Sequence, residues 1–198
     1  VKAGIFEDYA GRSREALALL QRGFERLDPE HDRRLYTTTQ LSILDTSLAC
    51  GEYQPAARLL FASGLRQAFA AEPLNLLKLR WVEGKIFAGL GRLDRAEQAF
   101  AAVRVGFEEQ LLPYNSAVAG LDLLAVFLRQ YRLAEVVALA AEILEVFERL
   151  SIGREALRAA EYLELACREG LITLAAVQHV ARFLSRFERD PSLVFAVP

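Results

Sequence analysis

The sequence predicts an all-α fold, an α–α superhelix of about five helical hairpins. Two observations lead to this prediction. A residue pattern recurs at a fixed long period along the chain, and between its corners apolar residues recur at three- and four-residue steps, as on one face of a helix. Alanine, leucine, glutamate and arginine dominate these segments, and all four are strong helix formers.

The long period is 40 residues and is clearest at three columns of the sequence. The first column holds Gly11, Gly51, Gly91, Tyr131 and Leu171; five places later come Ala16, Ala56, Ala96, Val136 and Ala176; four places further come Leu20, Leu60, Phe100, Ala140 and Val180. Because five copies stay in register without a gap, we predict a repeat array with units at about 1–30, 31–71, 72–111, 112–151 and 152–190.

Each unit is predicted to be two antiparallel helices of about 17–19 residues joined at the corner glycine. Prolines support these limits, since Pro29, Pro73, Pro113 and Pro191 fall where helices should begin or end. Asp28 and Thr173 are the predicted N-cap residues.

The stretch GLGRLD, residues 89–94, could also be interpreted as a phosphate-binding loop. Such a loop needs a preceding strand and a third glycine, whereas residues 74–90 have a helical pattern and Asp94 stands at the third position. We therefore interpret Gly91 as a left-handed residue that ends one helix, and Gly89 as a site where a neighbouring helix approaches closely.

Composition limits the classes of function. Of 198 residues, 53% are hydrophobic and 25% are charged, which is typical of a folded protein. The net charge of −2 leaves no basic surplus for displacing phosphate counterions, so we expect no direct nucleic-acid binding. No apolar run is long enough to span a bilayer, and the N-terminus does not resemble a signal peptide.

Cys50 and Cys167 lack disulfide or metal-ligand spacing, which favours a reduced, cytoplasmic setting. The chain begins at Val1 and contains no methionine, so we expect it to be part of a longer protein.

Signals for catalysis are weak. His31 and His179 have no second histidine or cysteine at ligand spacing, and Cys167 fits a buried helical position. Carboxylates such as Glu97 and Glu142 fall beside arginines on polar helix faces, where solvated ion pairing explains them. We expect no enzyme activity, no cofactor and no metal.

The order of residues within a unit resembles the tetratricopeptide repeat. The matching positions are Gly84, Phe87, Gly91, Ala96 and Phe100 in the third unit, and Leu44, Ser47, Gly51, Ala56 and Leu60 in the second. The period is longer than the family's usual one of about 34 residues. HEAT-type repeats have periods near 40 residues but lack the order glycine, alanine, aromatic, so they rank second. Tyr131 in place of the corner glycine, and the glycine displaced to Gly170, depart from the family pattern.

The long period is similar to that of arrays in large bacterial transcription activators such as the maltose-regulon activator. The resemblance implies a bacterial, cytoplasmic protein in which a DNA-binding module precedes the array. It also implies that the first helix of each unit lines a concave groove that holds a protein or peptide partner. By that register, the partner-binding residues are Thr38, Leu41, Asp45, Lys78, Trp81, Lys85, Leu121, Arg129, Arg158, Glu161 and Arg168.

Two features have alternative interpretations. Trp81 either packs between helices of adjacent units or anchors a partner in the groove. The polar residues Arg80, Glu83, Asp122, Arg154 and Glu155 form either a buried ladder between units or a site for an anionic ligand.

The segment DPSLVFAVP, residues 190–198, has no helical period, and we predict an extended tail at 191–198. The tail either covers the exposed end of the last unit or inserts into another molecule; covering is the favoured prediction.

Our functional hypothesis from the sequence is a non-catalytic scaffold that binds a peptide or protein in the concave groove. The alternative is an effector-sensing or oligomerisation domain of a bacterial transcriptional regulator, with possible homo-oligomers.

Overall fold

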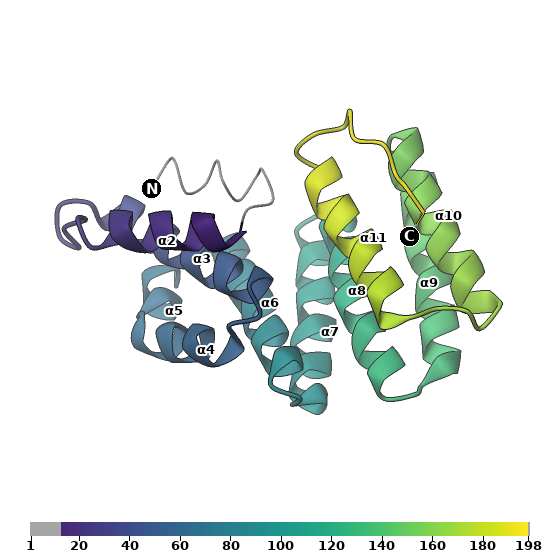
Figure 1. Ribbon diagram of the computed structural model, residues 1–198, viewed down its shortest axis with the longest axis horizontal. Helices are drawn as coiled ribbons and strands as arrows, with labels where there is room; N and C mark the ends of the chain where they lie inside the picture. The colour runs from purple at the N-terminus through teal and green to yellow at the C-terminus, as the bar shows by residue number, and fades with distance from the viewer. Residues whose placement is uncertain (1–12, 198) are drawn as a thin grey trace. The chain divides into compact units, whose positions relative to one another are not determined.

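The computed structural model describes residues 13–197, so the corner residue Gly11 and the start of the first predicted unit lie outside the described residues (Figure 1). Within that range the chain forms ten helices and no strand, which confirms the all-α prediction. The chain divides into two compact units, unit 1 up to Arg92 and unit 2 from Leu93 onward. The division falls inside the predicted third repeat, 72–111.

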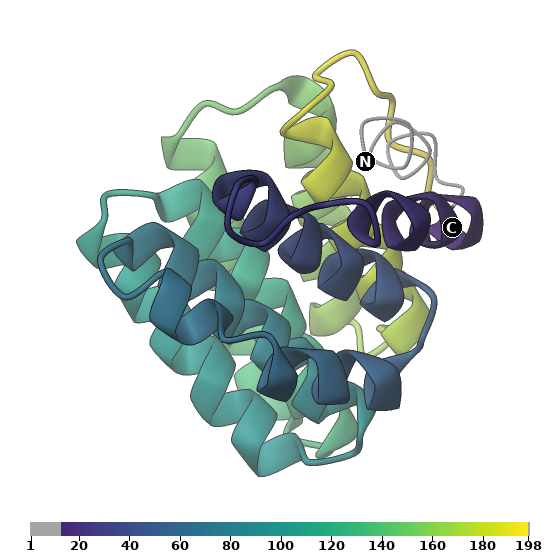
Figure 2. The same ribbon diagram turned by 90° about the vertical axis from the view of Figure 1, so that its left-hand side faces the viewer.

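The described part of unit 1 contains five helices: α2 (Ser13–Phe24), α3 (Arg33–Ala49), α4 (Tyr53–Ala62), α5 (Leu65–Ala68) and α6 (Pro73–Gly89). Figure 2 turns the purple-to-blue helices of this unit toward the viewer. Helix α3 is central, since it packs against α2, α4 and α6. An apolar cluster of this unit includes Leu44, Leu79, Val82 and Ile86.

Helix α4 is much shorter than the predicted 17–19 residues, because it ends at Ala62 after 10 residues. Gly64 has a φ of 63°, which turns the chain into the short α5. Leu65 and Phe69 then enter the core with exposures of 0% and 3%. Burial of these two side chains stabilises the turn relative to a continuation of α4.

Unit 2 contains α7 (Leu93–Glu109), α8 (Pro113–Arg129), α9 (Leu133–Arg149), α10 (Arg154–Arg168) and α11 (Leu174–Phe187). Each helix packs on the next, and α11 also packs on α8. Helices α8 to α11 therefore enclose a common core (Figure 1). Its fully buried side chains include Leu124, Ile143, Phe147, Leu163 and Leu184.

A hydrogen bond between residues far apart in the sequence joins α8 to α11. The hydroxyl of Tyr114 on α8 donates to the carbonyl of Leu184 on α11 at 2.8 Å. The end of α11 also packs on the start of α10, since Phe187 lies so close to Gly153 that a Cβ there would be 2.7 Å from its ring. In a simple array of hairpins the first helices, here α8 and α10, would be the neighbours. The superhelical arrangement stays a prediction.

The predicted left-handed corner is confirmed at Gly91, whose φ is 76°. The N–H of Arg92 donates to the carbonyl of Phe87 at 2.9 Å, and the N–H of Gly91 donates to Ala88 at 3.1 Å. These two bonds define a Schellman motif, which satisfies the last carbonyls of a helix. The same pair of bonds recurs around Gly51, Leu111, Tyr131 and Gly170, all with positive φ.

The predicted helix starts are mostly confirmed. Pro73 and Pro113 are the first residues of α6 and α8. The Thr173 side chain accepts from the N–H of Ala176 at 3.1 Å and caps α11. The prediction for Asp28 is wrong: its carboxylate accepts from the N–H of Glu30 at 2.8 Å, which stabilises a turn, and α3 begins only at Arg33.

The predicted close approach at Gly89 is also confirmed. A Cβ added there would lie 2.1 Å from the ring of Tyr53, the first residue of α4. Only glycine leaves room for this ring against the end of α6.

The C-terminal tail folds back onto unit 2, as the yellow segment in Figure 1 shows. Phe195 is 2% exposed and its ring lies within 6 Å of the rings of Tyr162, His179 and Phe183. The N–H of Phe195 donates to Glu155 at 2.8 Å, and the carbonyl of Ala196 bonds with His179 Nε2 at 2.8 Å. The prediction that the tail covers the last helix pair is confirmed.

Candidate functional site: an apolar groove between α4 and α6

A groove with a volume of about 580 Å³ lies between α4 and the C-terminal half of α6 in unit 1. Its apolar lining consists of Ala57, Leu60, Phe61, Ala62, Ile86, Phe87 and Leu90, and its polar lining of Gln54, Arg58, Glu83 and Arg92. All these residues belong to unit 1. A concave, mainly apolar surface with a few polar groups is the usual form of a binding site.

Phe61 is the most unusual residue of the groove, because its large aromatic side chain is 82% exposed. The 40-residue register places Gln21, Ala101, Ala141 and Ala181 at the equivalent position of the other second helices. An exposed aromatic side chain next to an apolar groove is typical of an interaction surface. The sequence analysis missed Phe61; a large aromatic residue in a column of small or polar residues was the signal that could have found it.

The charges of the groove are unevenly distributed. Glu83 accepts two hydrogen bonds from Arg66 Nη2, each of 3.0 Å, so its charge is already matched. Arg58 and Arg92 are exposed, and no ion pair joins either of them to another residue in the described range 13–197. The groove therefore carries two unmatched positive charges.

The residues predicted to line the concave groove fall into both units. Thr38, Leu41 and Asp45 lie on α3, and Lys78, Trp81 and Lys85 lie on α6; α3 and α6 pack together. Leu121 and Arg129 lie on α8, and Arg158, Glu161 and Arg168 lie on α10, whereas the main neighbours of α8 are α7, α9 and α11. Within unit 2 the predicted set is thus spread over helices that are not principal neighbours.

The prediction is wrong for one member of this set. Leu121 has 0% exposure, so it belongs to the core and cannot contact a partner. The reason is that α8 is packed by three other helices of unit 2, which leaves little of its surface uncovered. Most other members are exposed on their helices, namely Thr38, Asp45, Lys78, Arg129, Arg158, Glu161 and Arg168.

Trp81 is half-buried, and the ammonium group of Lys85 lies 4.6 Å from the centroid of its ring. This cation–π contact occupies part of the aromatic surface that a partner would otherwise meet. Both interpretations of Trp81 stay predictions.

The predicted buried polar ladder is wrong for four of its members. Arg80 and Arg154 are exposed. Glu83 pairs with Arg66, and Glu155 takes its hydrogen bonds from Phe195 N–H and Arg158. These groups are hydrated or locally paired, so they do not form a buried ladder.

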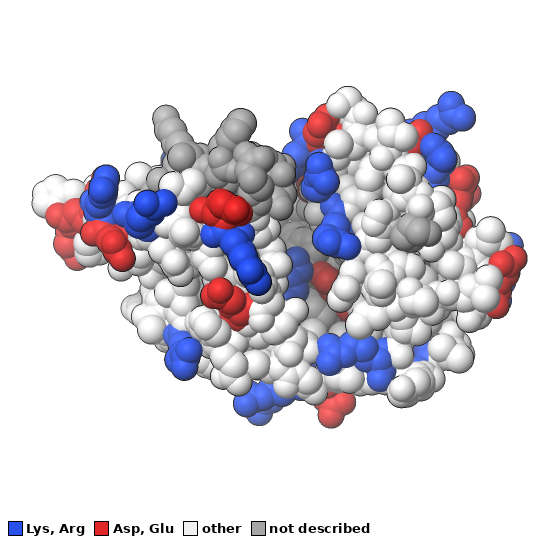
Figure 3. Space-filling view, in the orientation of Figure 1, with Lys and Arg blue, Asp and Glu red and all other residues white. Residues whose placement is uncertain are grey.

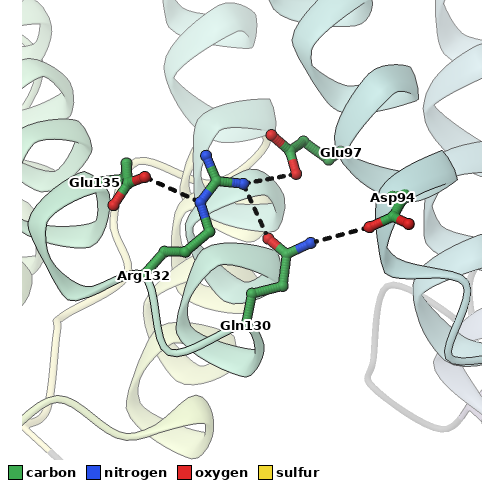
Figure 4. Close-up of polar contacts among 5 residues, drawn as sticks. All are labelled: Asp94, Glu97, Gln130, Arg132 and Glu135. Atoms are coloured by element: carbon green, nitrogen blue, oxygen red, sulfur yellow. Dashed lines mark hydrogen bonds and ion pairs between the residues drawn. The ribbon is translucent and has the colours of Figure 1, made fainter.

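A polar cluster ties the α8–α9 corner to the start of α7 (Figure 4). Arg132 donates to Glu97 at 2.8 Å, to Gln130 at 3.1 Å and, through Nε, to Glu135 at 3.0 Å. Glu97, followed by Glu135, raises the pKa of the Arg132 guanidinium, and Arg132 lowers the pKa of Glu135. Every member of this cluster has a partner within it, so we interpret it as a structural clamp.

The reactive side chains are engaged in packing or in turns. Burial raises the pKa of the Cys167 thiol to about 12, with a further contribution from Glu164, so the nucleophilic thiolate is scarce at neutral pH. His31 bonds with Asp28 at 2.9 Å in the turn before α3, and His179 holds the tail.

Among the residues that the structure describes, no group of three or more His, Cys, Asp or Glu side chains is placed to hold a metal ion. In the same range, no helix has the length and apolar character needed to cross a membrane.

On the face shown in Figure 3, acidic and basic side chains are interspersed with large uncharged areas. Local charge around each surface feature therefore determines what could bind there, more than the net charge of −2 does.

In comparisons with known proteins, no family model, no curated protein and no solved structure matches this chain.

Proposed function

We propose that this chain is a non-catalytic protein-interaction module, built from tetratricopeptide-like helical hairpins, that binds a segment of a partner protein in the α4–α6 groove. One observation supports the proposal above all: the groove has an apolar lining beside Phe61, which is 82% exposed. A large aromatic side chain in water is unfavourable for the isolated protein, and a partner that covers it would gain the free energy of its burial.

This proposal places the partner beside α4 and not only on the first helices of the hairpins. The reason is chemical. The first-helix set is mainly hydrophilic, whereas binding energy at interfaces is concentrated in buried aromatic and apolar contacts surrounded by polar groups. The α4–α6 groove offers this combination within one compact unit.

The absence of catalysis in the proposal is supported by the low reactivity of the Cys167 thiol. Cys167 is buried with a raised pKa, and the ion pairs of Arg132 with Glu97 and of Arg158 with Glu155 are partly exposed to solvent. Surface ion pairs are common in proteins and need no catalytic explanation.

The test is site-specific photo-crosslinking. A benzophenone amino acid at position 61 should capture a discrete partner in an extract of the source cells. The same group at Leu35, an exposed position on α3, serves as control. Unlabelled wild-type protein should compete for the captured partner, whereas the Phe61→Ser protein should not. Identical capture from both positions, or none from position 61, would contradict the proposal.

A further inference from the structure

The charge around the α4–α6 groove indicates the chemistry of its occupant. Arg58 lies on α4, and Arg92 follows the corner after α6; both line the groove and both are exposed. Glu83, the one carboxylate in the lining, is held by Arg66 through two bonds of 3.0 Å. A groove with two unmatched guanidinium groups and a neutralised carboxylate favours an occupant with carboxylates of its own.

Arg58 has no basic counterpart in the other second helices. In the other second helices the 40-residue register places Ala18, Gln98, Ala138 and Gln178 at the position of Arg58. The cationic side chain and the exposed Phe61 therefore occur together in one repeat, one helical turn apart on α4. Their combination creates a surface with an apolar centre and a positive edge.

The shape of the site favours a helical occupant. Two helices, α4 and α6, form its walls, and a third helix can pack its side chains between them in the ordinary manner of helix packing. An extended peptide usually gains affinity by adding to a sheet edge, and the described residues contain no strand. The early end of α4 at Ala62 adds to this access, because the helix does not continue along α6.

We propose that the groove binds an acidic amphipathic helix. Its apolar side chains, at positions i, i+3/i+4 and i+7, pack on Phe61, Leu60 and Leu90. Its flanking carboxylates pair with Arg58 and Arg92. This inference rests on the proposed function, because it identifies the class of partner for the same groove.

The test uses synthetic fluorescein-labelled helical peptides and fluorescence anisotropy. The first peptide has leucines at i, i+3, i+4 and i+7 with glutamates on both flanks, the second has lysines in place of the glutamates, and the third has the composition of the first in scrambled order. The first peptide should bind at least about tenfold more tightly than either of the others. The lysine peptide loses the two charge pairs with the arginines, and the scrambled peptide loses the continuous apolar face.

Matched variants test the arginines. The double variant Arg58→Glu/Arg92→Glu should weaken binding of the acidic peptide by about tenfold or more and should flatten its dependence on salt. The control Arg26→Glu/Arg33→Glu makes the same change of charge at exposed positions outside the groove and should bind as the wild type does. Circular dichroism checks that both proteins remain folded.

The possible failures are distinguishable. If position 61 crosslinks a partner while the lysine peptide binds as well as the acidic one, the groove is used but the inference about its occupant is wrong. Equal effects of the two double variants, or no measurable binding of the acidic peptide, would also overturn it. If position 61 captures nothing, the proposed function itself fails.

Discussion

At the residue scale, the corners of the hairpins show what sequence can reveal about backbone conformation. Gly51, Gly91 and Gly170 have positive φ, and a glycine in the sequence indicates this conformation. Leu111 and Ser151 adopt the same conformation, with φ of 58° and 48°. Nothing in these side chains signals a left-handed residue, and at Leu111 the surrounding Schellman bonds impose the conformation. The glycine corners were therefore predictable, whereas the other corners were not.

Gly91→Val should lower the free energy of unfolding by about 1–2 kcal/mol. The cost arises from the backbone, because φ is 76° and a Cβ would meet no atom within 4 Å. Urea denaturation measures the change. Gly91→Asn is the control and should cost less, since asparagine tolerates the left-handed region better than other residues. An unchanged midpoint for valine would contradict the corner assignment.

Tyr131→Gly should have the opposite effect. Tyr131 has a φ of 59° and is 87% exposed, so its replacement removes backbone strain and little packing. We expect a gain of about 0.5–1 kcal/mol, after the greater chain entropy of glycine in the unfolded state is subtracted. Tyr131→Ala keeps the strain and should give no gain. Equal thermal midpoints for the alanine and glycine variants would show that the corner is not strained.

At the element scale, the break after α4 explains why the candidate site was not predicted. Counting repeats gave a full-length second helix, whereas Gly64 and the burial of Leu65 and Phe69 end it at Ala62. The Ser63–Gly64 pair was visible in the sequence as a turn signal. The end of α4 at this turn was not predictable, because the burial of the side chains that follow depends on long-range packing against α6.

The tail is an element whose contribution to stability can be measured. Phe195 is 2% exposed, and Phe195→Ala should lower the unfolding free energy of unit 2 by about 2 kcal/mol through lost apolar burial. Val194→Ala is the matched control in the neighbouring position, where the side chain is 73% exposed, and should change stability little. Chemical denaturation compares the two. Equal midpoints would mean that the tail is not docked in solution.

Docking of the tail should also depend on pH. The N–H of Phe195, followed by Arg158, lowers the pKa of Glu155 below its ordinary value of 4.5. The ionised carboxylate therefore stabilises the docked tail above about pH 4.5, and this stabilisation is lost as the pH falls through the lower folded-state pKa. The amide resonance of Phe195 should report the change in an NMR titration. Glu155→Gln should remove the transition, and its persistence in that variant would assign it to another group.

At the scale of the whole molecule, local regularities were predictable and long-range pairings were not. The period and the apolar stripes give helices and their corners, because both are properties of short segments. They do not determine that α11 lies beside α8, which depends on contacts such as that of Tyr114 with Leu184, 70 residues apart. The prediction of the binding residues was based on the register of a repeat family. Such a register cannot predict a groove that arises because one repeat is irregular.

The enclosed core of unit 2 leads to the prediction that residues 93–198 fold alone. Helices α8 to α11 surround side chains of 0% exposure such as Phe147 and Leu163, so this fragment should bury enough apolar surface to unfold cooperatively. Circular dichroism of the isolated fragment should show helix and a single thermal transition. Phe147→Asp should abolish that transition, because a carboxylate would be buried without a partner. A fragment that is helical but melts gradually, with the aspartate variant indistinguishable from it, would mean that unit 2 needs the rest of the chain to pack.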